Sequence, residues 1–151
     1  MKKVSFFASR KKLITLWMII SLFIFIVFFV QSINGKYTSH VKDIWQWVFQ
    51  FLTPALTLMI GILVAQLLGG TPDSEVDVFF YRLAMGVSIF FLLLLLLSPF
   101  IVPFLHIQQN KDLAVDQQKN IFVAFQTYDI FLLPLQGLTM LTLGLFFSKN
   151  K

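Results

Sequence analysis

One carboxylic acid, Asp129, lies within a strongly apolar stretch of the sequence. A carboxylate inside a membrane costs about 2.5–3.5 kcal/mol on insertion scales, so such a residue usually has a function. One interpretation is a proton- or ion-handling role for this intramembrane acid. The other is an interfacial acid that caps the helix or lies at headgroup level. The second is favoured, because the apolar run from Ile130 to Phe147 is long enough to span a membrane alone.

A stripe of polar and small residues follows helical spacing in the apolar stretch 44–68. Its members are four, three, four and four residues apart, which places them on one side of a helix. Lipid offers an amide no hydrogen-bond partner, so protein or water must face this stripe. Helix packing is the favoured interpretation, and a water-filled path in an oligomer is the alternative. We call this stripe the seam; it consists of Gln46, Gln50, Thr53, Thr57 and Gly61.

The last apolar stretch has a similar character. It carries Gln136, Thr139 and Thr142, which we predict to join the same assembly or pore-lining surface. The motif F-L-x-P occurs at 51–54 and again at 131–134, which indicates a weak 2+2 repeat of helical hairpins. Chance matches are frequent in apolar sequence, so real duplication is the less favoured explanation.

Catalytic and metal-binding chemistry has little support in the sequence. The chain has no cysteine, and His40 and His106 fall in predicted loops rather than inside facing helices, where a haem or metal site would need them. No nucleophile elbow, phosphate-binding loop, paired-carboxylate spacing or zinc motif is present. We therefore predict a protein that is not an enzyme and that holds no metal and no cofactor.

The composition indicates that this chain is surrounded by lipid rather than by water. Hydrophobic residues make up 58% of the 151 positions and charged residues only 13%, whereas soluble domains carry about 25% charge. The formal net charge is +5, but the basic residues cluster before the first apolar run and after the last one. That distribution is typical of orientation signals beside a membrane and not of a nucleic-acid surface. The lipid bilayer is thus the expected partner, and nucleic acid is not.

Four apolar runs are long enough to cross a bilayer. The first is longer than the core of a signal peptide and has no cleavage pattern after it, so we expect it to be retained. Trp45 and Trp47 are expected to anchor the second run at the interface, and Pro99 and Pro103 to kink or end the third. The predicted fold is an all-α integral membrane protein, a bundle of four transmembrane helices at approximately 13–30, 44–68, 83–105 and 121–147.

The distribution of lysine and arginine predicts the orientation. With both termini in the cytoplasm, the inner side holds more basic residues than the outer side. This arrangement places Arg82 inside and Asp129 toward the outer half, so the two are not expected to pair. The domain prediction is a basic cytoplasmic N-terminus at 1–12, one transmembrane domain at 13–147 and a basic cytoplasmic tail at 148–151. A bacterial inner (plasma) membrane is the expected location.

Three functions are consistent with these features. The leading hypothesis is a non-enzymatic membrane protein that self-assembles and acts as a pore- or channel-forming, membrane-permeabilising subunit. The second is an anchor or scaffold subunit whose seam binds a partner membrane protein. The third is a small ion- or proton-coupled transporter subunit, which depends almost wholly on Asp129.

Overall fold

The fold is almost entirely helical. A computed structural model of the chain describes residues 3–37, 40–69, 75–110 and 120–148. Its elements, in chain order, are β1 (Lys3–Ser5), α1 (Phe6–Ile33), α2 (Val41–Gly69), β2 (Glu75–Asp77), α3 (Val78–Asn110) and α4 (Ile121–Ser148).

The helices of the described residues have the length and composition of membrane spans. All four, α1 to α4, are long and apolar enough to cross a bilayer. The 28 residues of α1 extend about 42 Å, whereas a hydrocarbon core is about 30 Å thick. The prediction of an all-α integral membrane protein with four transmembrane helices is confirmed.

Helices α1, α2 and α3 begin earlier than the apolar runs alone predict, and in α1 and α3 a polar side chain caps the added first turn. Helix α1 begins at Phe6, where the Ser5 hydroxyl accepts a hydrogen bond from the Ala8 amide at 3.4 Å. Helix α3 begins at Val78, where the Asp77 carboxylate accepts one from the Phe79 amide at 3.0 Å. Most of the predicted N-terminal basic segment is therefore the first part of a helix.

The prolines of α3 do not end the helix, which continues to Asn110. Pro99 has no amide hydrogen, so the carbonyl of Leu95 loses its usual donor. The buried Ser98 hydroxyl donates to that carbonyl at 2.7 Å. Of the two expected effects of the prolines, a kink or an end, the end does not occur. At Pro99 a side chain of the same helix replaces the missing donor.

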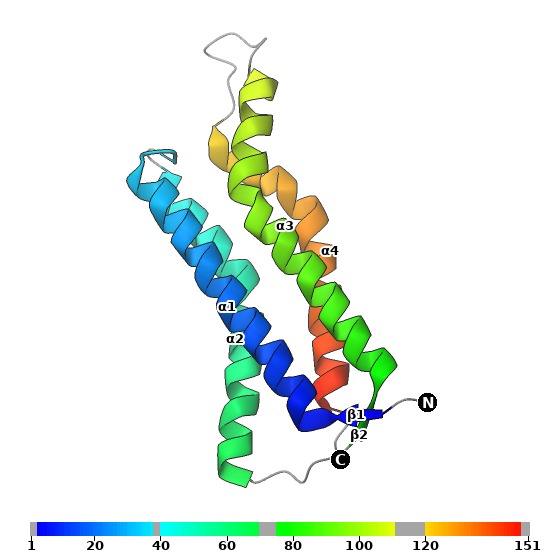
Figure 1. Cartoon of the computed structure of the whole chain (residues 1–151). Coiled ribbons are helices and arrows are strands. Elements are labelled where there is room, and N and C mark those ends of the chain that lie inside the picture. The colour runs from blue at the N-terminus through cyan, green and yellow to red at the C-terminus, as the bar shows by residue number, and fades with distance from the viewer. Residues whose placement is uncertain (1–2, 38–39, 70–74, 111–119, 149–151) are drawn as a thin grey trace.

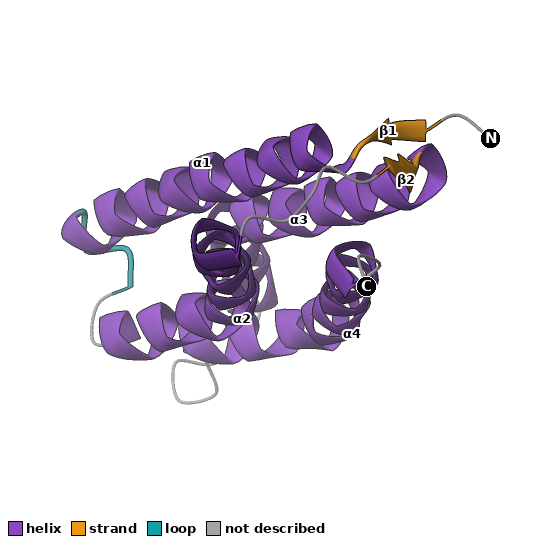
Figure 2. Ribbon diagram, turned by 90° about the horizontal axis from the view of Figure 1, so that it is seen from below, coloured by secondary structure: helices purple, strands orange, loops and turns teal. Residues whose placement is uncertain are grey.

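The helices form a bundle in which chain neighbours are antiparallel (Figure 1). Helix α1 packs against α2 and α3, and α4 packs against α2 and, most extensively, against α3. Figure 2 shows the same arrangement along the bundle. Helices α2 and α4 contain Pro54 and Pro134 respectively, and both change direction part-way along (Figure 1). Both prolines are exposed. The duplication of hairpins stays a prediction.

Aromatic rings fill much of the interior. Trp17 of α1 stacks on Phe91 of α3 with ring centroids 5.9 Å apart. Trp47 of α2 meets Phe125 of α4 edge-on at 4.8 Å. Among the described side chains of α2, Met59 is the last buried one, and those from Ile60 to Val64 are exposed or half-buried. The second half of α2 therefore lies at the edge of the bundle.

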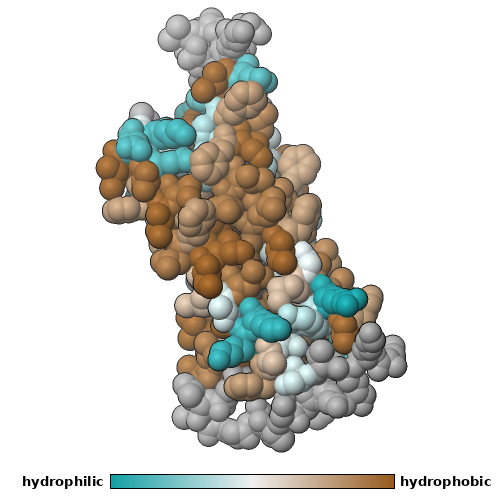
Figure 3. Space-filling view, in the orientation of Figure 1, coloured by the Kyte–Doolittle hydropathy of each residue, from teal (hydrophilic) through white to brown (hydrophobic). Residues whose placement is uncertain are grey.

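The outer surface has the pattern of a membrane protein. Many large apolar side chains are exposed, such as Ile19, Phe90 and Phe131. Figure 3 shows a broad apolar belt with hydrophilic residues toward its two ends. Such a surface would aggregate in water but is suited to lipid.

Arg10 joins the beginning of α1 to the end of α4. Its guanidinium donates to the main-chain carbonyl of Phe147 at 3.3 Å and lies 3.7 Å from the centre of the Phe6 ring. Carbonyls at a helix C-terminus are partly negative and lack partners in their own helix, so a cation stabilises them. Strand β1 pairs with β2 at the same end, where Val4 is opposite Val76. Helix α1 thus begins at the end of the bundle where α4 finishes (Figure 1).

We predict that Arg10→Ala lowers the free energy of unfolding by about 2 kcal/mol, because a charged hydrogen bond and a cation–π contact are both lost. Arg10→Lys should lose less, since it keeps the charge. The measurement is chemical unfolding in detergent, followed by tryptophan fluorescence. Lys11→Ala, at the exposed neighbouring position, is the control. An equal loss for the control would show that Arg10 has no special role.

Candidate functional site

The seam lies on the outside of the bundle. All five of its members, Gln46, Gln50, Thr53, Thr57 and Gly61, are exposed. None of the polar side chains among them forms a hydrogen bond with another residue that the structure describes. The opposite face of α2 is the one that packs inward, through Trp47, Phe51, Ala55 and Met59. The described part of the protomer therefore supplies no hydrogen-bond partner for the side chains of the seam.

Gly61 contributes space to this surface. A methyl group added at its α-carbon would meet nothing within 4 Å, so no neighbour in the protomer requires a glycine here. A small residue on a membrane helix allows another backbone to approach closely. Close approach at Gly61 would thus involve a surface outside the described protomer.

The polar residues of α4 have a different environment from the seam. Thr139 and Thr142 are buried, and their hydroxyls donate to the carbonyls of Leu135 at 2.7 Å and of Thr139 at 2.9 Å. Such bonds to the preceding turn satisfy hydroxyls inside a helix. The sequence predicts one kind of surface on both helices, but the structure directs Thr139 and Thr142 inward and the seam outward.

Gln136 connects α4 to the seam. Its amide donates to the Gln50 carbonyl at 3.0 Å and more weakly to the Phe51 carbonyl at 3.5 Å. The Gln50 carbonyl is the one that Pro54, four residues later, leaves without a donor. A side chain from the neighbouring helix therefore completes the hydrogen bonding of the α2 backbone at its proline.

A second contact between α2 and α4, nearer to the first residues of both helices, is made by Trp47 and Asp129. The Trp47 indole N–H donates to the Asp129 carboxylate. Trp47 is only 3% exposed, so its ring is inside the bundle and does not anchor the lipid-facing surface as predicted. Trp45 is half-buried and donates to the Ser32 hydroxyl of α1 at 3.1 Å. Both tryptophans thus connect helices.

Asp129 is not a helix cap. The cap of α4 is Asn120, whose side chain accepts from the Val123 amide at 2.9 Å. Asp129 lies two turns further along, half-buried against Trp47. Arg82 is near the start of α3, at the opposite end of the bundle from the start of α4, as expected from the topology (Figure 1).

The connection between α1 and α2 is held by polar contacts that sequence reasoning missed. The Tyr37 hydroxyl donates to the Gln31 side chain at 2.6 Å, and burial raises the pKa of Tyr37. His40 lies 3.3 Å from the Asp43 carboxylate and stacks on the Phe122 ring. Tyr37 and His40 stand in the connection itself, and their partners lie near the ends of α1, α2 and α4. Contacts between a loop and separate helix ends follow no periodic pattern that the sequence could signal.

The described residues form no cluster of metal ligands. They contain no group of three histidines, cysteines or acids that could hold a metal ion. The buried hydroxyls of Ser21 and Ser88 and the Trp17 indole have no hydrogen-bond partner within the described part of the chain. Comparison of the chain with protein-family models, with curated proteins and with solved structures found no match. The seam is therefore the best candidate for a functional surface.

We predict that Gln136→Leu destabilises the protein by about 1 kcal/mol, because the Gln50 carbonyl loses its donor. In a Pro54→Ala background the helix supplies its own amide at residue 54, so Gln136→Leu should then have little effect. A double-mutant cycle of unfolding free energies in detergent measures this coupling. Strictly additive effects would contradict the assignment of Gln136 to the proline-freed carbonyl.

Proposed function

We propose that this protein is a non-enzymatic membrane protein that self-assembles through the seam of α2 and acts as a pore- or channel-forming subunit. The observation that supports the proposal is the exposure of the seam. Its polar side chains lie on the surface of an apolar helix and have no hydrogen-bond partner among the described residues. A single protomer in lipid would leave these groups unsatisfied.

A second copy of the chain is a suitable partner for the seam. The Gln46 and Gln50 amides each offer both donors and an acceptor, so identical stripes can bond to each other. Thr53, Thr57 and Gly61 are small enough for helices to approach closely. A two-fold symmetric contact joins the same surface of both copies, and the seam suits such a contact because it is self-complementary.

The packing of the bundle favours a water-filled path between several copies over one through the interior of a single protomer. Aromatic side chains such as Trp17, Phe91 and Phe125 occupy the interior. From Gln46 to Gly61 the seam extends about 22 Å, which is most of a hydrocarbon core about 30 Å thick. Several copies that face a common centre with this stripe would provide polar groups along most of the membrane.

We place both termini in the cytoplasm, in a bacterial inner membrane. Helix α1 begins at the end of the bundle where α4 finishes, and basic residues gather in the sequence next to both (Figure 1). Basic residues are retained on the cytoplasmic side of membrane proteins. We therefore assign the end of the bundle where α1 begins and α4 finishes to the cytoplasmic side.

The anchor or scaffold function uses the same seam with a different partner. Amides and small residues also bind a helix of another membrane protein, and that assembly needs no water path. Reconstitution of the purified chain alone distinguishes the two, because only the pore requires nothing else.

We predict that Gln50→Leu combined with Thr53→Leu reduces self-association and dye release from liposomes by about tenfold, because seam hydrogen bonds are lost. Gln136 binds the main-chain carbonyl of residue 50, so this substitution keeps the α2–α4 bond. The measurements are energy transfer between labelled copies and release of an entrapped dye.

Gln126→Leu is the matched control, since it removes an exposed glutamine from α4, outside the seam. It should leave both measurements unchanged. Wild-type protein that associates through the seam but releases no dye or ions would contradict the pore and support the scaffold. Wild-type protein that stays monomeric would contradict self-assembly.

Asp129→Asn tests the transporter alternative. Asparagine keeps an oxygen that can accept the Trp47 hydrogen bond but cannot bind or release a proton at neutral pH. We expect dye release and proton flux from liposomes to remain within about twofold of the wild type. Selective loss of proton flux would instead support an ion- or proton-coupled function.

A further inference from the structure

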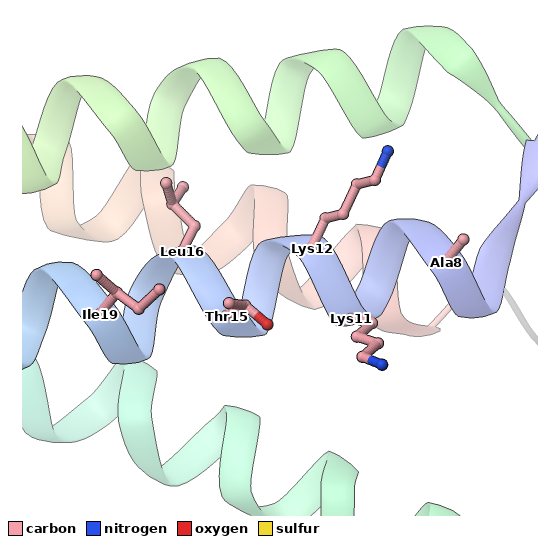
Figure 4. Close-up of a pocket in the computed structure, with 6 residues that line it drawn as sticks. All are labelled: Ala8, Lys11, Lys12, Thr15, Leu16 and Ile19. Carbon is pink, nitrogen blue, oxygen red and sulfur yellow. The ribbon is translucent and has the colours of Figure 1, made fainter.

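A shallow, open cavity of about 510 Å³ lies along the exposed face of α1 and is lined by residues of that helix alone. It is in the first half of the helix, near the end of the bundle that carries the basic residues. The residues that line it are Ala8, Lys11, Lys12, Thr15, Leu16 and Ile19 (Figure 4).

The lining of the cavity is mainly apolar, and the charged ends of its two lysines lie at its edges. Figure 4 shows Lys11 and Lys12 leaving neighbouring positions of α1 toward its two edges, while Leu16 and Ile19 lie further along the helix. Thr15 lies between the lysines and these two apolar residues in the sequence and adds a hydroxyl. A ligand that fits this lining has an anionic group at one end and a hydrocarbon portion at the other.

The two lysines are available to such a ligand. Both are exposed, and neither forms an ion pair with another described residue. Arg10, the next basic residue, is buried and bonded to Phe147, so it does not contribute to this charge. An anion at this edge of the cavity would therefore meet positive charge that no described carboxylate compensates.

The lysines are also at the right depth for a lipid headgroup. From Leu13 to Ile33 helix α1 extends about 31 Å, which matches a hydrocarbon core of about 30 Å. Lys11 and Lys12 therefore lie at the headgroup level, and Leu16 and Ile19 lie beside the first carbons of the acyl chains. Basic residues at this level attract anionic lipids.

We propose that this cavity binds one anionic phospholipid. The phosphate lies at the edge of the cavity, where the long side chains of Lys11 and Lys12 can reach it and the Thr15 hydroxyl donates to it, and an acyl chain covers Leu16 and Ile19. A zwitterionic phosphatidylcholine is a weaker ligand, because its choline cation lies close to the same two lysines. The proposal does not depend on the seam or on pore formation.

The test is native mass spectrometry of the purified protein, titrated with phosphatidylglycerol, with phosphatidylcholine of the same chains, and with glycerol 3-phosphate. We expect phosphatidylglycerol to bind at least tenfold more tightly than the other two. Lys11→Gln combined with Lys12→Gln should weaken its binding about 25-fold, since each lysine near an anionic headgroup contributes roughly fivefold. Lys36→Gln combined with Lys42→Gln removes the same charge from exposed lysines at the other end of the bundle and should change binding less than twofold.

Three results would overturn the proposal: equal affinity for the two lipids, equal losses for the two double variants, or full competition by glycerol 3-phosphate, which would indicate a site for phosphate alone. Lys11→Arg combined with Lys12→Arg keeps the charges and should retain binding. Thr15→Val, which leaves both lysines in place, should weaken phosphatidylglycerol binding by several-fold if the hydroxyl donates to the phosphate. Circular dichroism confirms that each variant is folded.

Discussion

Lipid supplies no hydrogen-bond partner, and this constraint governs the arrangement of the polar groups in the bundle. Where Pro99 interrupts the bonding of α3, the Ser98 hydroxyl of the same helix donates to the free carbonyl. Where Pro54 interrupts α2, the donor is Gln136 of α4. The hydrogen bond at Pro99 forms within one helix, whereas the one at Pro54 forms only if α2 and α4 pack in a fixed register. The backbone hydrogen bonding of α2 therefore depends on the packing of α4 against it.

The same constraint separates two sets of polar side chains that look alike in the sequence. The hydroxyls of Thr139 and Thr142 are buried and donate to carbonyls of α4 itself. They therefore need no hydrogen-bond acceptor from another helix. The seam of α2 is exposed and has no such bonds among the described residues. Its hydrogen-bonding capacity is therefore the feature that supports assembly with another membrane helix.

Charge at the basic end of the bundle has two separate uses. Arg10 is buried, and it stabilises the C-terminal carbonyls of α4. Lys11 and Lys12 follow it directly in the sequence but face outward beside the cavity of α1. Because neighbouring residues on a helix are about 100° apart, three consecutive basic residues are divided between the interior of the bundle and its exposed surface.

The sequence by itself determined the class of the fold and the positions of the spans, because each run of about 20 apolar residues has the length that crosses a hydrocarbon core as a helix. It also placed the seam on one side of α2, since helical periodicity is local. Only the tertiary structure decided which polar residues face inward, that Trp47 is buried against Asp129, and that Gln136 serves the carbonyl freed by Pro54. These outcomes depend on the rotation and register of one helix against another, which contacts between residues far apart in the chain determine.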